Sequence, residues 1–106
     1  MQLENISAKE LVALISNQAY QIIDLRNVSE FHKQHVKNAV QIDSKDILSN
    51  HLEKIHKRYL IVYCARGGES MRVARQLSLK GYYVKNVIGG FYEIKNYQNI
   101  LNSGQF

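Results

Sequence analysis

The seven residues Cys64-Ala65-Arg66-Gly67-Gly68-Glu69-Ser70 constrain this chain more than any other stretch. They follow an apolar run at 59–63 and precede a helical pattern that starts at Met71. Such a run is typical of a buried parallel strand, and open α/β sheets carry their active sites at the carboxyl ends of those strands. Two glycines allow a tight turn, and a serine at the start of a helix can cap free amides. The stretch therefore predicts a strand, a tight loop headed by a thiol, and a helix.

Two interpretations of Cys64 are open. A lone cysteine after an apolar strand is often only a small buried apolar residue. The loop that follows favours a different role, because amides of a tight turn and of a helix N-terminus attract an anion. Such surroundings favour the reactive thiolate. We therefore expect Cys64 to be a nucleophile.

The loop length and its residues argue against phosphoryl transfer as the reaction of this thiol. A cysteine phosphatase places an arginine six residues after its cysteine, whereas Ser70 occupies that position and Arg72 lies two residues further on. The loop thus lacks the guanidinium fork that clamps a phosphoryl group. A small cradle suits a smaller group, such as one additional sulfur on Cys64.

The rest of the chain alternates strand and helix patterns. Ser7 and Glu10 form a capping box, which predicts a helix with Leu11, Leu14 and Ile15 on one face. Further strands are predicted at 21–25, 40–42 and 82–88, and further helices at 27–34, 46–56, 71–80 and 91–98. Gly81 is expected to end the helix 71–80, and the tail after Asn99 is expected to be loosely held. This order predicts a single α/β domain over residues 1–106, with a small central parallel sheet flanked by helices on both faces.

Composition limits the compartment and the partners. One cysteine excludes an internal disulfide, which favours a reducing compartment and predicts a cytoplasmic protein. Near its start the chain shows no signal-peptide pattern, and no apolar run is long enough to predict a membrane span. The net charge of +5 favours anionic small molecules or acidic partners, but the basic residues are scattered. We expect no nucleic-acid or membrane partner, and a monomer rather than a homodimer.

Motifs along most of the chain resemble those of one enzyme family. They are Ile23-Asp24-Leu25-Arg26, Glu30-Phe31, His35-Val36, Ala39, the loop from Cys64 to Glu69, the stretch Gly81 to Val84, and Gly89-Gly90-Phe91. In this order and combination they are similar to the single-domain rhodaneses, which are sulfurtransferases. The resemblance implies that Cys64 is the catalytic cysteine and lies at the carboxyl edge of the sheet.

The chain departs from the family pattern at four positions. Gln34 and Asn38 stand where glycines are usual, and Ile94 replaces a frequent tryptophan. Asn38 is a mild change because asparagine tolerates a positive φ. Glu69 brings a carboxylate into the loop, where it would oppose the thiolate and repel anionic donors, and Arg66 would offset it.

The resemblance implies a reaction in which Cys64 takes a sulfane sulfur from thiosulfate or a persulfide such as glutathione persulfide. A thiol or a protein acceptor then removes it. The amides of the substrate-binding loop would hold the outer sulfur, Arg66 would contact the donor anion, and Arg72 would be a second contact; the loop residues are Ala65, Arg66, Gly67, Gly68, Glu69 and Ser70. No cofactor is required. The alternatives are a persulfide carrier and a non-catalytic interaction module.

Other polar residues favour structural interpretations. Asp24 and Arg26 are expected to form an ion pair, with Glu30, that fixes the loop after a strand. His35 is expected to be a structural hydrogen-bonding residue, because an ionised thiolate needs no general base. Neither His32 with His35 nor His51 with His56 is completed by further ligands, so we expect no metal.

Overall fold

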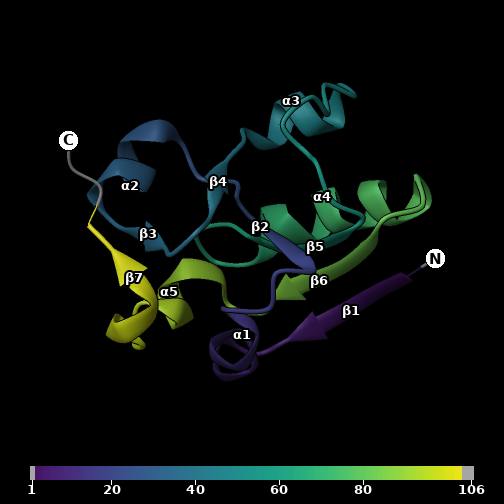
Figure 1. Cartoon of the computed structure of the whole chain (residues 1–106). Coiled ribbons are helices and arrows are strands. Elements are labelled where there is room, and N and C mark those ends of the chain that lie inside the picture. Colours follow the sequence, from purple (N-terminus) through teal and green to yellow (C-terminus); the bar gives the residue numbers. More distant parts are fainter. Residues whose placement is uncertain (1, 104–106) are drawn as a thin grey trace.

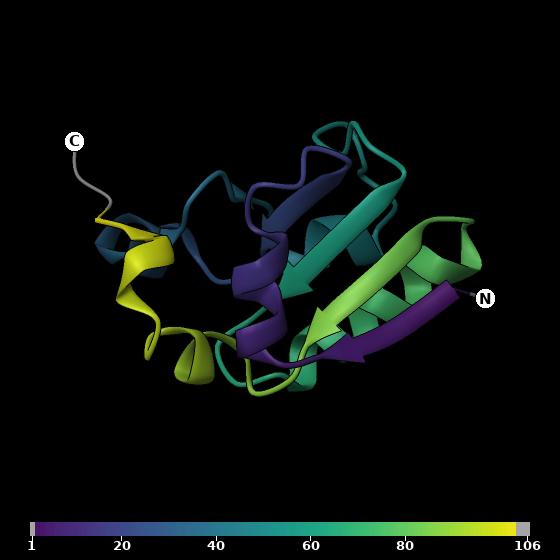
Figure 2. The same ribbon diagram turned by 60° about the horizontal axis from the view of Figure 1, so that its bottom comes forward.

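The apolar run before Cys64 forms the central strand of a parallel sheet in the computed structural model, which describes residues 2–103. Five strands pair in the order β1-β6-β5-β2-β4, all parallel. Their bounds are β1 Gln2–Ile6, β2 Tyr20–Asp24, β4 Val40–Gln41, β5 Tyr59–Tyr63 and β6 Tyr83–Val87. Figure 2 shows the long strands side by side, with their arrowheads at one edge. Cys64 lies at that carboxyl edge, as predicted.

Helices cover both faces of the sheet (Figure 1). On one face α4 (Gly68–Leu79) and α3 (Ser44–Leu48) pack against Leu60 and Val62. On the other, α1 (Ala8–Leu14) and α5 (Gly90–Ile94) pack against Ile22 and Ile61. Each of these fully buried side chains stabilises the fold by about 1.5–3 kcal/mol. Within residues 2–103, no helix combines the length and the apolar character that a membrane crossing requires.

The predicted start of α1 is confirmed. The amide of Glu10 donates to Ser7 Oγ over 3.1 Å, and the amide of Ser7 donates to Glu10 Oε1 over 2.8 Å. The predicted end of α4 is also confirmed, because Gly81 follows the cap residue Lys80 with φ +98°. Local capping chemistry was thus a sufficient guide at these helix ends.

The edge strand β1 was not predicted from the sequence. Its residues Gln2, Leu3, Glu4 and Asn5 are largely polar and mostly exposed, and only Ile6 is buried. An edge strand with one exposed side gives no continuous apolar run. β1 forms because its whole length pairs in register with β6.

The predicted helix at 46–56 is wrong in extent. α3 ends at Leu48, and the segment 49–58 forms no further helix. Asn50 takes φ +67°, which stops the right-handed helix there. Leu52 and Ile55 still pack against the core, so their apolar spacing reflected burial rather than helix.

The C-terminal predictions also need correction. α5 ends at Ile94 instead of continuing to 98, and a 3₁₀ turn, η1 (Gln98–Ile100), follows. The tail after Asn99 is not loosely held. Ile100 and Leu101 are buried, and β7 (Leu101–Asn102) pairs antiparallel with β3 (His35–Val36), the strand that follows α2 (Val28–Lys33). The rest of that tail, 104–106, lies outside the described residues.

Candidate active site

The thiol of Cys64 sits at the end of β5 inside a turn of backbone amides. Its Sγ accepts hydrogen bonds from the amide of Gly67 over 3.1 Å and from the amide of Ser70 over 3.2 Å. Cys64 is only 5% exposed. Both donors are backbone groups fixed by the fold, and the second belongs to the first turn of α4. The site therefore presents a sulfur atom to two preorganised donors that favour negative charge on it.

Two glycines allow the loop to close around this sulfur. Gly67 caps α4 with φ +107°, and a Cβ there would come within 3.1 Å of the amide nitrogen of Gly89. At Gly90, a Cβ would meet the carbonyl oxygen of Cys64 at 2.5 Å. The turn before α5 thus packs directly on the thiol loop. The amide of Phe91 donates to that same carbonyl over 2.8 Å, which holds the two segments together.

The sequence predicted that Ser70 caps α4, and this prediction is wrong, because Gly67 occupies the cap position. The Ser70 side chain is buried and lies 2.5 Å from Asn86 Oδ1 and 3.2 Å from the carbonyl oxygen of Gly67. Asn86 in turn donates to Asn5 Oδ1 over 3.1 Å. A polar chain therefore runs from the first turn of α4 through β6 to the edge strand. Asn86 gave no signal in the sequence, because one polar residue in an apolar strand does not reveal its partner.

A buried ionic group fixes the neighbouring strand ends. Arg26 donates to Asp24 through its Nε over 3.0 Å and its Nη2 over 2.7 Å, and Asp24 is fully buried. Tyr63 donates its hydroxyl proton to Asp24 over 2.6 Å and accepts from the amide of Val36 over 3.1 Å. Glu30 is more distant, at 3.9 Å from Arg26. The predicted ion pair is confirmed, with Asp24 rather than Glu30 as the main partner.

This group shifts the acid–base behaviour of its members. Burial raises the pKa of Tyr63 well above its ordinary value, and the charge of Asp24 raises it further. Burial alone would lower the pKa of Arg26, but the hydrogen bond and charge of Asp24 outweigh it, so that pKa is raised. Arg26 therefore stays charged and Tyr63 neutral over the ordinary pH range.

A small pocket of about 160 Å³ opens beside the thiol loop. Ala65 and Arg66 from the loop line it, together with Arg26, Glu30, Tyr92 and Lys95. The guanidinium of Arg66 lies over the Tyr92 ring, 4.7 Å from its centroid. Sequence reasoning missed Tyr92 and Lys95. Their spacing of three on a predicted helix would have placed them on one face, but nothing connected that face with Cys64.

The other predicted site residues point elsewhere. The carboxylate of Glu69 accepts from Ser44 Oγ over 2.8 Å and lies 3.8 Å from Arg72. Both partners lie outside the loop, so this carboxylate is anchored away from the position expected inside the cradle. Arg72 is paired with Glu69 and is 66% exposed at its side chain. The backbone of Gly68 begins α4.

The histidines hold structural or surface positions. His35 Nδ1 lies 2.9 Å from the carbonyl oxygen of Phe31, and the two rings stack at 3.9 Å, which agrees with the structural role expected for His35. Across residues 2–103, His, Cys, Asp and Glu side chains form no group of three or more that could hold a metal ion.

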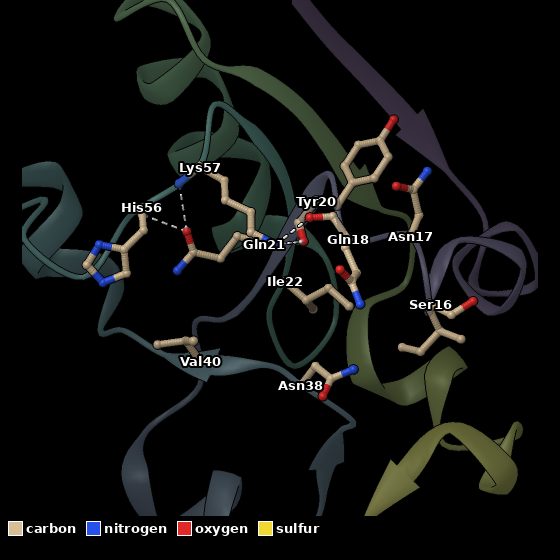
Figure 3. Close-up of a pocket in the computed structure, with 11 residues that line it drawn as sticks. Ser16, Asn17, Gln18, Tyr20, Gln21, Ile22, Asn38, Val40, His56 and Lys57 are labelled. Carbon is tan, nitrogen blue, oxygen red and sulfur yellow. Dashed lines mark hydrogen bonds between the residues drawn. The ribbon is translucent and has the colours of Figure 1, made fainter.

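A larger cavity of about 510 Å³ lies at the opposite, amino edge of the sheet, and Figure 3 shows its lining. Gln21 extends from β2 beside it and accepts hydrogen bonds from the amides of His56 and Lys57. The ammonium of Lys57 donates to the carbonyl oxygens of Gln18 and Tyr20. The polar groups there hold chain segments together, and the cavity contains no residue of the thiol loop.

Comparisons with known proteins agree with one another. The model of a family described as the rhodanese-like domain matches residues 7–97. The thiosulfate sulfurtransferase GlpE of Coxiella burnetii is 32% identical over 93 residues, which cover 86% of this chain and 86% of that protein.

Solved structures show the same fold. Reduced CoADR-RHD of Bacillus anthracis is similar with a TM-score of 0.82 and 26% identity, covering 93% of this chain and 18% of that one. A rhodanese-related protein of Thermoplasma volcanium has a TM-score of 0.82 and 24% identity, covering 94% of this chain and 98% of that one. At this last identity the likeness concerns the fold alone.

Proposed function

Because the chain belongs to the rhodanese-like domain family, we propose that it moves a sulfane sulfur from thiosulfate or a persulfide donor to a thiophilic acceptor through a persulfide on Cys64. The observation that carries the proposal is the pair of amides, from Gly67 and Ser70, aimed at the sulfur of Cys64. A relative named as a thiosulfate sulfurtransferase supports the same reaction type.

The reaction is a double displacement with a covalent intermediate. The Cys64 thiolate attacks the outer sulfur of thiosulfate. The sulfur–sulfur bond of the donor breaks, sulfite leaves with its electron pair, and Cys64 carries a persulfide. An acceptor thiolate then attacks the outer sulfur of that persulfide, and Cys64 leaves again as the thiolate. No electrons are gained from outside, so the cycle needs no redox cofactor.

The backbone amides of the loop and the nearby arginines have different proposed roles. Backbone amides from Ala65 to Ser70 would hold the outer sulfur, and those of Gly67 and Ser70 donate to the Cys64 Sγ from which that sulfur would extend. Arg66 is exposed and free to contact a donor anion. Arg72 would be a weaker second contact because Glu69 already engages it. A reducing compartment, such as the cytoplasm, would keep Cys64 free between turnovers.

A persulfide carrier is the second candidate, and Glu69 favours it. Its carboxylate lies in the first turn of α4, beside the loop that holds the thiol, and would weaken the encounter with small anionic donors. A carrier would load from a protein and would turn over thiosulfate poorly. An interaction module without catalysis has less support, because the thiol and both of its amide donors are present.

Mass spectrometry of the intact protein tests the proposal. After incubation with thiosulfate or glutathione persulfide and removal of the donor, the protein should gain one sulfur atom, and cyanide or a thiol should remove it. Cys64→Ser should abolish loading and turnover while its melting temperature stays close to that of the wild type. Since Cys64 is the only cysteine, any protein persulfide must sit there.

The outcomes separate the candidates. Loading with steady thiosulfate turnover supports the enzyme. Loading from a persulfide with negligible turnover of small donors supports the carrier. A wild-type protein that never loads with any donor tried would overturn the proposal and leave the interaction module.

A further inference from the structure

The pocket of about 160 Å³ beside the thiol loop carries charges of both signs. Arg66 comes from the loop, Glu30 from α2, and Lys95 follows the end of α5. Three separate segments thus converge beside the loop that begins at Cys64. Chemistry that needs a bound substrate beside Cys64 would use this space first.

The two cations on one side are available to a ligand. Arg66 and Lys95 each lie 4.7 Å from the centroid of the Tyr92 ring, so both cations contact the same aromatic side chain. Within residues 2–103, neither forms an ion pair with a carboxylate, and both are exposed. Arg26 differs, because its guanidinium is buried and bound to Asp24.

The carboxylate of Glu30 is also under-used. Its oxygens lie 3.9 Å from Arg26 and 3.9 Å from Lys33, beyond hydrogen-bond distance in both cases. The Glu30 side chain is 51% exposed. It can therefore accept a hydrogen bond from a cationic group in the pocket without losing a strong internal bond.

We infer that this pocket binds the amino-acid head group of a small acceptor thiol, such as cysteine or the γ-glutamyl end of glutathione. The carboxylate of the head group pairs with Arg66 and Lys95, which line the pocket, and its ammonium group faces Glu30. The pocket of about 160 Å³ has room for a head group of this size. The inference rests on the proposed function, because it names the acceptor class of that same site.

The transfer step balances with this acceptor. The bound thiol loses its proton to solvent and attacks the outer sulfur of the Cys64 persulfide, which is in its protonated form. A new bond joins the acceptor sulfur to the outer sulfur, and the bond from Cys64 to the outer sulfur breaks. Cys64 leaves as the thiolate, and the acceptor leaves as its hydropersulfide.

Four thiols test which charges the pocket recognises. Loaded protein is isolated, and the loss of its extra sulfur is timed with L-cysteine, 3-mercaptopropionate, cysteamine and 2-mercaptoethanol. The second thiol lacks the ammonium group, the third lacks the carboxylate, and the fourth lacks both. Each rate constant is divided by the 2-mercaptoethanol value of the same variant, so that changes in persulfide reactivity cancel.

Lys95→Gln should lower the normalised rate with L-cysteine and 3-mercaptopropionate by about three- to fivefold, as expected for one exposed charge contact, but not with cysteamine. Glu30→Gln should lower it with L-cysteine and cysteamine, but not with 3-mercaptopropionate. Lys54→Gln and Glu53→Gln make the same charge changes in the exposed segment after α3 and serve as matched controls.

Crossed effects of this kind support the inference. A loss in Lys95→Gln with no loss in Glu30→Gln would show a pocket for anions alone and would overturn it, as would equal losses with all four thiols. Should Cys64 fail to load, the proposed function fails, and binding of S-methyl-L-cysteine still tests the pocket by NMR. Shifts at Tyr92 that Lys95→Gln removes would support the head-group site, and absence of binding would overturn it.

Discussion

The two edges of the sheet hold hollows of unequal size and opposite character. The amino edge has the larger cavity, about 510 Å³, and the carboxyl edge has the pocket of about 160 Å³ beside Cys64. In the larger cavity, the side chains of Gln21 and Lys57 form hydrogen bonds with neighbouring backbone groups. In the smaller one, Arg66 and Lys95 have no ion pair with any described carboxylate. Charged side chains without an ion-pair partner, rather than cavity volume, therefore distinguish the edge where we expect the reaction to take place.

Both edges are also fixed by buried polar side chains, but at different cost. The amino edge uses the neutral amide of Gln21, whereas the carboxyl edge uses the ionised pair Asp24 and Arg26 with the phenol of Tyr63. Burying charge is expensive unless every partner is present. The carboxyl edge should therefore be the more sensitive to loss of a single hydrogen bond.

Tyr63→Phe should show this sensitivity most strongly. It removes the hydroxyl that binds Asp24 and leaves the buried amide of Val36 without a partner, which should lower the free energy of unfolding by about 2–4 kcal/mol. Urea denaturation measures the change, and Tyr59→Phe, at an exposed ring, is the matched control. A loss below about 0.5 kcal/mol would show that water replaces the phenol.

The same variant should flatten the alkaline pH profile of stability. The pKa of Tyr63 is raised by folding, so the unfolded chain releases this proton first. The stability it contributes is complete below about pH 10, the ordinary tyrosine value, and is lost as pH rises toward the folded pKa. Wild-type stability should fall more steeply than that of Tyr63→Phe above pH 10. Parallel profiles would contradict the assigned shift.

Gln21→Leu at the amino edge should have a smaller effect. The change keeps most of the side-chain volume but removes the acceptor of the His56 and Lys57 amides and the donor to the Lys54 carbonyl. Because these groups border an open cavity, water can replace part of the loss, and we expect about 1–3 kcal/mol. Loading of Cys64 should persist at temperatures where the variant is folded. Loss of loading in the folded variant would show that the two edges are coupled.

The sequence was sufficient to predict the features that local chemistry determines. The apolar run before Cys64, the capping box at Ser7 and the glycines around the loop led to the parallel fold and to the thiol at its carboxyl edge. The family resemblance is confirmed by the match over residues 7–97. These signals lie within a few residues of one another, so they can be read along the chain.

Features that depend on partners distant in the sequence were not predicted. β1 is a strand because β6 pairs with it, and Ile100 is buried because the chain returns to β3. Likewise, Lys95 meets Arg66 only through the ring of Tyr92. Glu69 was placed correctly in the loop region, but its side chain turns to Ser44, which is distant in sequence.

The smallest expected effect concerns Glu69 and compares the loss of one negative charge at two positions in the molecule. Glu69→Gln removes a carboxylate from the start of α4, and Glu53→Gln removes one from the segment after α3, so both raise the net charge by one. Glu69→Gln should increase kcat/KM for thiosulfate by about two- to threefold at low salt. The wild-type carboxylate near the thiol loop repels the dianion, and its removal also frees Arg72 from its ion pair. The gain should disappear near 0.5 M salt, where screening shortens the range of the charge. Glu53→Gln should change the rate by less than half as much. Equal gains in the two variants would show that overall charge, rather than position at the carboxyl edge, governs donor capture. A decrease in Glu69→Gln alone would instead show that its bond to Ser44 holds the loop in its active shape.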